Sequence, residues 1–202
     1  MAGYIDAHHH IWRLIDLDWL NGPVQPRIFG DYQSIKQDYS IIDFRADLDG
    51  SGVEKSVYIQ VNWPAGQEQE EALWIEKVNQ ETGWPQALVA YVDFSAEDAA
   101  ETLSSFRSIP IMRGIRQQLH WHKNPLYCFQ PAPDLMNQPI WRNNFARIQE
   151  ALRVIEEFAR KADPDLSNIS AKIRYSLYDI ETKTIRLSKG AIRRQALHDS
   201  NL

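Results

Sequence analysis

The sequence lacks the features of secreted and membrane proteins. Its 202 residues include one cysteine, Cys128, so no disulfide bond forms within the chain. No apolar run approaches the about 18 residues that a membrane-spanning helix needs. The segment from Met1 to Asp6 has no basic stretch followed by an apolar one, so no signal peptide is expected. These absences predict a cytoplasmic protein that does not contact a membrane.

Charge divides the chain into two parts. Residues 1–146 hold 11 Lys and Arg against 19 Asp and Glu, whereas residues 147–202 hold 11 against 8. The first part is therefore acidic and the second basic, which marks a boundary between them. The basic part does not interleave aromatic and basic side chains, so no nucleic-acid partner is expected.

Short apolar segments alternate with helical patterns in the acidic part. Strands are predicted at residues 4–9, 56–61, 87–93 and 111–116. A helix is predicted over 67–82 with Gly83 as its end, and Ser95 is predicted to cap the next helix. A short helix is also expected near 41–48. This alternation predicts an α/β fold with four parallel strands, which is half of a TIM-type barrel.

The basic part has a helical period instead. A stripe that repeats every 3.6 residues consists of Ile148, Leu152, Ile155 and Ala159. Ser167 is then expected to cap a second helix that carries Ile169, Ile173, Leu177 and Ile180. The two helices predict an antiparallel helical hairpin. The expected domains are a half-barrel over residues 1–143 and this hairpin over 144–202.

Three consecutive histidines stand at the end of the first predicted strand. Alternate residues of a strand share a face, so His8 and His10 are expected to point together into a barrel mouth, with His9 turned away. Such a pair can hold one divalent ion. Asp6 has the same parity and either orients a ligand or binds from below. The alternative is a polar cluster without a ligand.

Four motifs give the acidic part a family resemblance. The opening Asp6-Ala7-His8-His9-His10-Ile11-Trp12 is similar to that of the lactonase-like branch of the amidohydrolase superfamily. Three further segments match that branch in order, at residues 57–60, 88–93 and 113–121. The resemblance covers about 140 residues and implies a TIM barrel. It also implies a divalent ion, zinc or manganese, and hydrolysis of a small lactone, ester or amide by metal-activated water.

The sequence departs from that family after Arg116. Such barrels take further metal ligands and a catalytic aspartate from later strands, and no such strand follows here, so the catalytic residues are unknown. Arg116 is a candidate for binding a substrate carboxylate, with a packing arginine as the alternative. His120 and His122 follow the fourth strand directly and are either substrate-binding residues of the mouth or surface residues.

The basic part resembles a different family. Residues 147–160 and 172–178 are similar to the helical N-terminal extension of bacterial, notably cyanobacterial, thiamine-phosphate synthases. The chain is therefore interpreted as fused or truncated. Three functions stay open: a metal-dependent hydrolase of a small molecule with little activity as an isolated chain, a non-catalytic remnant or interaction module, and an accessory role in thiamine biosynthesis. An open half-barrel is also expected to form homo-oligomers or aggregates.

Overall fold

The computed structural model describes residues 3–27, 30–148, 176–179 and 184–187. Two compact units make up the chain, Met1–Ile155 and Glu156–Leu202, and each is described by itself. Within the described residues, no helix is both long and apolar enough to cross a membrane.

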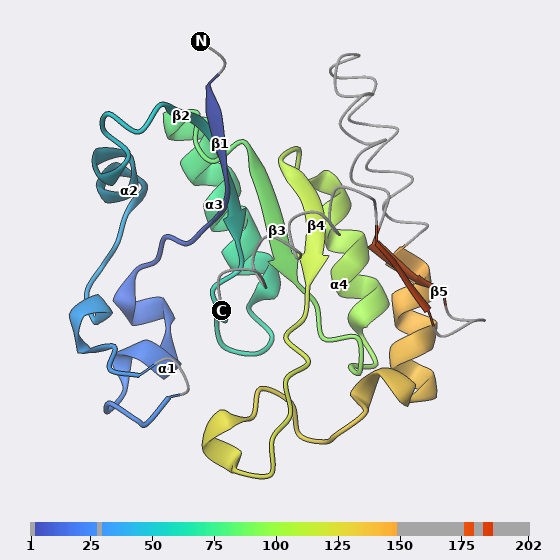
Figure 1. Cartoon of the computed structure of the whole chain (residues 1–202). Helices are drawn as coiled ribbons and strands as arrows, with labels where there is room; N and C mark the ends of the chain where they lie inside the picture. The colour runs from blue at the N-terminus through green and yellow to red at the C-terminus, as the bar shows by residue number, and fades with distance from the viewer. Residues whose placement is uncertain (1–2, 28–29, 149–175, 180–183, 188–202) are drawn as a thin grey trace. The chain divides into compact units, whose positions relative to one another are not determined.

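The first unit is built on a parallel sheet of four strands. They are β1 (Tyr4–His9), β2 (Val53–Ile59), β3 (Ala87–Tyr91) and β4 (Met112–Arg116). The strands lie in the order β1-β2-β3-β4, and each pairs in parallel with the next (Figure 1). The four predicted strands and their parallel arrangement are therefore confirmed.

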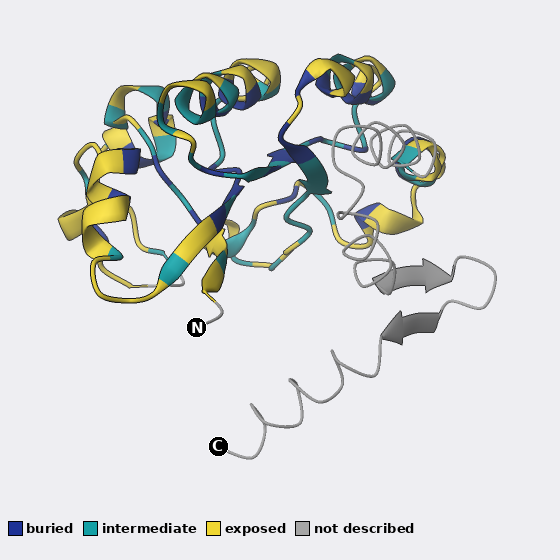
Figure 2. Cartoon of the chain, turned by 90° about the horizontal axis from the view of Figure 1, so that it is seen from above, coloured by how far each residue is buried: buried dark blue, intermediate teal, exposed yellow. Residues whose placement is uncertain are grey.

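Helical segments connect these strands, and the longer helices cover one side of the sheet (Figure 2). The helices are α1 (Asp18–Asn21), α2 (Ile41–Asp47), α3 (Glu68–Thr82) and α4 (Ala99–Ser105). Short 3-10 turns occur at Leu14–Asp16, Gln33–Ile35, Phe106–Ser108, Pro125–Tyr127 and Leu135–Asn137. A further helix begins at 139 and is described to 148. Each strand is thus followed by helical structure, as in βα units.

The ends of α2 and α3 follow from their sequences. Ser40 caps α2 through a capping box with Asp43, in which each side chain bonds the other residue's backbone N–H. Gly83 ends α3 at φ 76°, a left-handed conformation that glycine adopts without steric cost. The predicted end of this helix is confirmed.

The predicted cap of the next helix is wrong. Helix α4 begins at Ala99 after Asp98, and no side chain caps it. Ser95 instead donates its hydroxyl to Asp93 Oδ1, which also accepts the backbone N–H of Ser95. The serine therefore closes a turn after β3, because the nearby aspartate offers its side chain an acceptor earlier in the chain.

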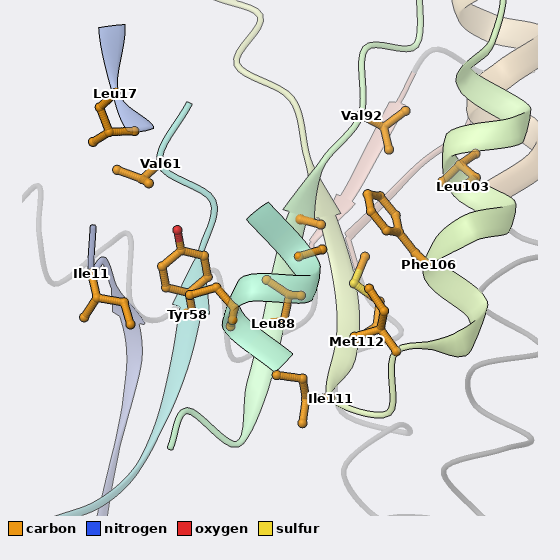
Figure 3. Packing of buried hydrophobic residues seen from close by; sticks show 14 of the residues in the cluster. Ile11, Leu17, Tyr58, Val61, Leu88, Val92, Leu103, Phe106, Ile111 and Met112 are labelled. Carbon is orange, nitrogen blue, oxygen red and sulfur yellow. The ribbon is translucent and has the colours of Figure 1, made fainter. Parts of the chain in front are cut away.

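The core lies between the sheet and the helices. Leu88, Ala90 and Val92 alternate with half-buried residues along and beyond β3, which is the period of a strand with one covered face. Leu103 and Phe106 pack near Met112 on the helix side (Figure 3). Tyr58 is fully buried in the same cluster and donates its hydroxyl to Glu71 of α3. The side chains of His8 and His10 lie on the opposite side of the sheet.

The C-terminal unit differs from the prediction where it is described. Strands β5 (Ser176–Asp179) and β6 (Thr184–Leu187) pair antiparallel. Leu177, expected on a helix, pairs with Arg186 in this hairpin. The local run of aromatic and β-branched residues favours strand over the weaker helical period. The remainder of the predicted second helix, and most of the first, lies outside the described residues.

The boundary between the units lies later than the predicted 143/144. The first unit extends to Ile155 because the helix of 139–148 packs against the turn after β3. Asn144 donates to the carbonyls of Phe94 and Ala96, at 3.0 and 2.9 Å. Trp141 and Phe145 contact the Phe94 ring, with centroids 5.4 and 5.5 Å away. This helix therefore belongs to the half-barrel unit.

Candidate active site

A cavity of about 680 Å³ lies where the four strands end. Its lining takes His10 from the end of β1, Gln60 from the end of β2, and Tyr91 and Arg116 from the last positions of β3 and β4. Aromatic side chains of the surrounding loops add an apolar wall; they are Trp12, Trp19, Trp63 and Phe129. Convergent polar groups within an apolar wall are typical of small-molecule sites.

His8 and His10 converge on this side of the sheet, as the alternation of β1 predicts. Their Nε2 atoms lie 3.3 Å apart. His10 Nδ1 lies 2.7 Å from the carbonyl oxygen of Ile59 in β2. A carbonyl only accepts, so Nδ1 must carry the proton and Nε2 must present its lone pair towards His8. Burial lowers the pKa of His10, which favours this neutral form.

His9 points the other way, also as predicted. Its ring stacks on Phe44 of α2, with centroids 3.9 Å apart, and its Nε2 lies 3.0 Å from Ser56 Oγ. Burial lowers its pKa to about 4. His9 is therefore a neutral residue of the core, and its contacts there keep His8 and His10 directed to the other side of the sheet.

The His8–His10 pair fits half of a metal site. Two imidazole nitrogens bound to a tetrahedral zinc ion at about 2.0–2.1 Å lie about 3.3–3.4 Å apart, which matches the pair. A histidine ligand also usually donates its second ring N–H to a carbonyl, as His10 does. Asp6 accepts the backbone N–H of His8 at 3.0 Å and so braces the strand. Among the described residues, no group of three metal-binding side chains gathers.

Arg116 brings a positive charge to the cavity. Its guanidinium is half-buried, and burial lowers its pKa. The ion pairs among the described residues are Arg13 with Asp16 and Lys77 with Glu81, so Arg116 has no acidic partner there. An arginine in this state is well suited to a ligand carboxylate, which it can bind with two hydrogen bonds.

The two later histidines do not line the cavity. His120 is exposed beside Phe129, and His122 packs beside Tyr127 and accepts the backbone N–H of Asn124 at 2.9 Å. Their loop does reach the cavity, through Gln118, Cys128, Phe129 and Gln130. Their role in substrate binding stays a prediction.

Glu71 is a cavity residue that the sequence did not single out. This α3 side chain is 3% exposed and accepts hydrogen bonds from the Tyr58 hydroxyl and the Val61 N–H, at 2.7 and 2.8 Å. Burial raises its pKa to about 7, against the opposing effect of these hydrogen bonds. It therefore anchors the segment after β2 to the helix layer. In the sequence it is one of several acidic residues at a helix start, which is the pattern of a solvated turn.

Two solved structures have a fold similar to that of this chain. An amidohydrolase from Burkholderia multivorans with bound HEPES superposes with a TM-score of 0.53 at 21% identity, over 74% of this chain and 46% of its own. A zinc-bound structure of an amidohydrolase from the same organism also has a TM-score of 0.53, at 18% identity, over 90% of this chain and 62% of its own. These similarities show the fold, a partial barrel of the kind that these two structures have. The expected barrel type is thereby confirmed.

A curated relative covers a similar share of the chain. The uncharacterized protein y4mH of Sinorhizobium fredii is 32% identical over 146 residues, which is 71% of this chain and 49% of the relative. The chain thus spans about half the length of this relative.

A segment that begins within the first unit matches other proteins. The ThiD2 family model matches residues 134–183. A thiamine-phosphate synthase of Prochlorococcus marinus MIT 9313 is 54% identical over 74 residues, covering 36% of this chain and 21% of that enzyme. One from Synechococcus sp. CC9605 is 51% identical over 80 residues, covering 40% and 22%. The predicted resemblance to these synthases is confirmed for a segment of about a fifth of their length.

Proposed function

We propose that the half-barrel is a hydrolase-type site in which His8 and His10 hold a divalent ion, zinc or manganese, beside a cavity for a small carboxylate-bearing lactone, ester or amide. The observation that carries the proposal is the 3.3 Å separation of the two Nε2 atoms, with His10 held in the ligand tautomer by Ile59. The zinc-bound amidohydrolase of similar fold supports it. The proposed compartment is the cytoplasm, which suits the lone Cys128.

The chemistry follows from three parts of the cavity. A divalent ion at the histidine pair would lower the pKa of a bound water molecule and polarise a substrate carbonyl. Arg116 would hold a substrate carboxylate, because it has no acidic partner among the described residues. The wall that contains Trp12, Trp19 and Trp63 would exclude water from the apolar part of the ligand.

Two histidines make this site weak in one chain. Catalytic zinc usually has three protein ligands and one open position, and the described residues supply two beside the cavity. We therefore expect little or no hydrolysis from a single chain, even with added zinc or manganese.

The test is metal binding rather than turnover. Equilibrium dialysis with zinc should show uptake by the unaltered chain and a loss of at least tenfold in affinity for the double variant His8→Ala, His10→Ala. The matched control is His120→Ala, His122→Ala, which removes two histidines at the same spacing outside the cavity lining. Equal zinc uptake by all three proteins would contradict the proposal, because it would put the ion elsewhere.

A second candidate function comes from the synthase-like segment. The ThiD2 match at residues 134–183 supports an accessory role in thiamine biosynthesis, in which this segment contacts a protein of that pathway. A catalytic role in that pathway has no support, because the segment matches about a fifth of each synthase. Zinc dialysis separates the candidates, since an interaction module does not need the His8–His10 pair.

A further inference from the structure

Both outer strands of the sheet have a free edge. In the order β1-β2-β3-β4, β1 pairs only with β2 and β4 only with β3 among the described residues. Parallel sheets are normally covered on both faces, and their free edges readily pair with other strands. Among the described residues, each outer edge of the sheet therefore presents backbone N–H and C=O groups that no further strand pairs with.

β1 is also exposed to a degree that a parallel strand rarely shows. His9 is its one buried residue, while Tyr4 is 68% and Ile5 is 59% exposed. Ile5 pairs with Lys55 of β2 and, like Tyr4, is left largely uncovered at this outer strand of the sheet. A neighbouring strand with its own helix would cover both residues.

A second copy of the sheet fits these edges. β1 and β4 have similar lengths, six and five residues, and the four strands run in one direction. A two-fold axis along the strands would place β4 of each copy beside β1 of the other, giving eight parallel strands and no edge.

The same pairing would bring the two metal-binding pairs together. In that closed sheet, β1 of the second copy takes the fifth position, directly across the barrel from β1 of the first. The interior of an eight-stranded barrel is just wide enough for side chains to fill it. His8 and His10 of each copy are on the interior side, so four imidazoles would meet there instead of two.

We propose that two copies of this chain pair through the free edges of β1 and β4, and that the His8–His10 pairs of both copies bind one shared divalent ion. The second clause rests on the proposed function; the first stands on the sheet edges alone. The partner is a second copy because each sheet offers both complementary edges. The net charge of −5 per chain opposes the pairing, so association should strengthen as added salt screens it.

The test of pairing is molar mass by light scattering, at about 0.15 M salt where the Debye length is about 8 Å. The full chain should have twice its 23.5 kDa mass. Ile5→Lys should return it to one mass, because a charge at the free edge of β1 blocks strand addition. The matched control is Leu73→Lys on α3, 48% exposed and over the middle strands, which should stay dimeric. A monomer at all concentrations, or assembly unaffected by Ile5→Lys, would overturn the inference.

Zinc stoichiometry tests the shared ion independently. One zinc per two chains is expected, and none for the His8→Ala, His10→Ala variant, which should remain a dimer because its edges are intact. A monomer that binds zinc through these histidines would overturn the pairing and leave the proposed function standing. A dimer that is sensitive to Ile5→Lys but binds no zinc would leave the pairing standing and overturn the proposed function. A dimer that binds two zinc ions would overturn the proposal that the two copies share one ion.

Discussion

Replacing Glu71 by glutamine should change how the stability of the half-barrel depends on pH. Glu71 is 3% exposed on α3, and burial raises its pKa from 4.5 to about 7. That rise corresponds to roughly 3 kcal/mol, at about 1.4 kcal/mol for each pKa unit. Glutamine keeps an oxygen that can accept from the Tyr58 hydroxyl and the Val61 N–H, but it carries no charge at any pH.

The sign follows from where the proton is held. The pKa is higher in the folded chain, so between pH 4.5 and about 7 the folded state keeps a proton that the unfolded state releases. Glu71 therefore costs nothing below the unfolded pKa, destabilises the fold increasingly as the pH rises towards 7, and has its full cost above it. Glu71→Gln should gain stability relative to the unaltered chain over this window.

The assay is urea unfolding followed by tryptophan fluorescence at about pH 5 and about pH 8, with the difference in unfolding free energy taken at each pH. That difference should shift by about 2–3 kcal/mol in favour of glutamine at the higher pH. The neutral, buried His9, whose pKa is about 4, affects both proteins equally and cancels. A difference that is the same at both pH values would refute the reasoning, because it would mean that Glu71 ionises as freely in the folded chain as in the unfolded one.

Two local contacts give further predictions. Asn144→Ala should destabilise the first unit by about 1–3 kcal/mol, because it removes both hydrogen bonds to Phe94 and Ala96. The control Asn143→Ala, at an exposed neighbour, should change the stability by less than about 0.5 kcal/mol. Equal effects of the two variants in thermal unfolding would contradict the packing of this helix. Ser40→Ala should cost about 1 kcal/mol of stability, because it removes the cap of α2. Urea unfolding measures this loss, with Ser34→Ala at an exposed position as the control. No loss would mean that the capping box does not stabilise the helix.

Periodicity predicted the frame of the first unit because the elements are regular and locally determined. The apolar run of β3 and the helical stripe before Gly83 each specify their element without distant contacts. The start of β2 at Val53 was missed, since Glu54 and Lys55 are charged and exposed, and strand pairing with β1 rather than burial makes them a strand. Alternation along β1 likewise predicted the convergence of His8 and His10, because side chains two residues apart in a strand lie on the same face of the sheet.

Tertiary contacts decide the parts that the sequence could not predict. Glu71 reads as one acidic residue among several at the start of α3, and only its position over the end of β2 makes it a buried acceptor. Arg116 was a candidate by residue type; that it has no acidic partner in the described part of the chain is a property of the folded neighbourhood. Leu177 fits a helical period and a strand period, and pairing with β6 selects the strand.

The helix of 139–148 shows that similarity and packing divide this chain at different places. The ThiD2 match begins at residue 134, so this helix falls within the synthase-like segment, yet it lies in the unit that ends at Ile155. Its contacts explain why. Trp141 donates its indole N–H to Gln117 Oε1 at 2.8 Å, and Gln117 donates to Asp93, so the helix joins the polar ends of β3 and β4. A βα unit requires an amphipathic helix behind its strand, not a particular ancestry. By meeting that requirement, the helix ties the ends of β3 and β4 together, and among the described residues the outer edges of β1 and β4 pair with no further strand.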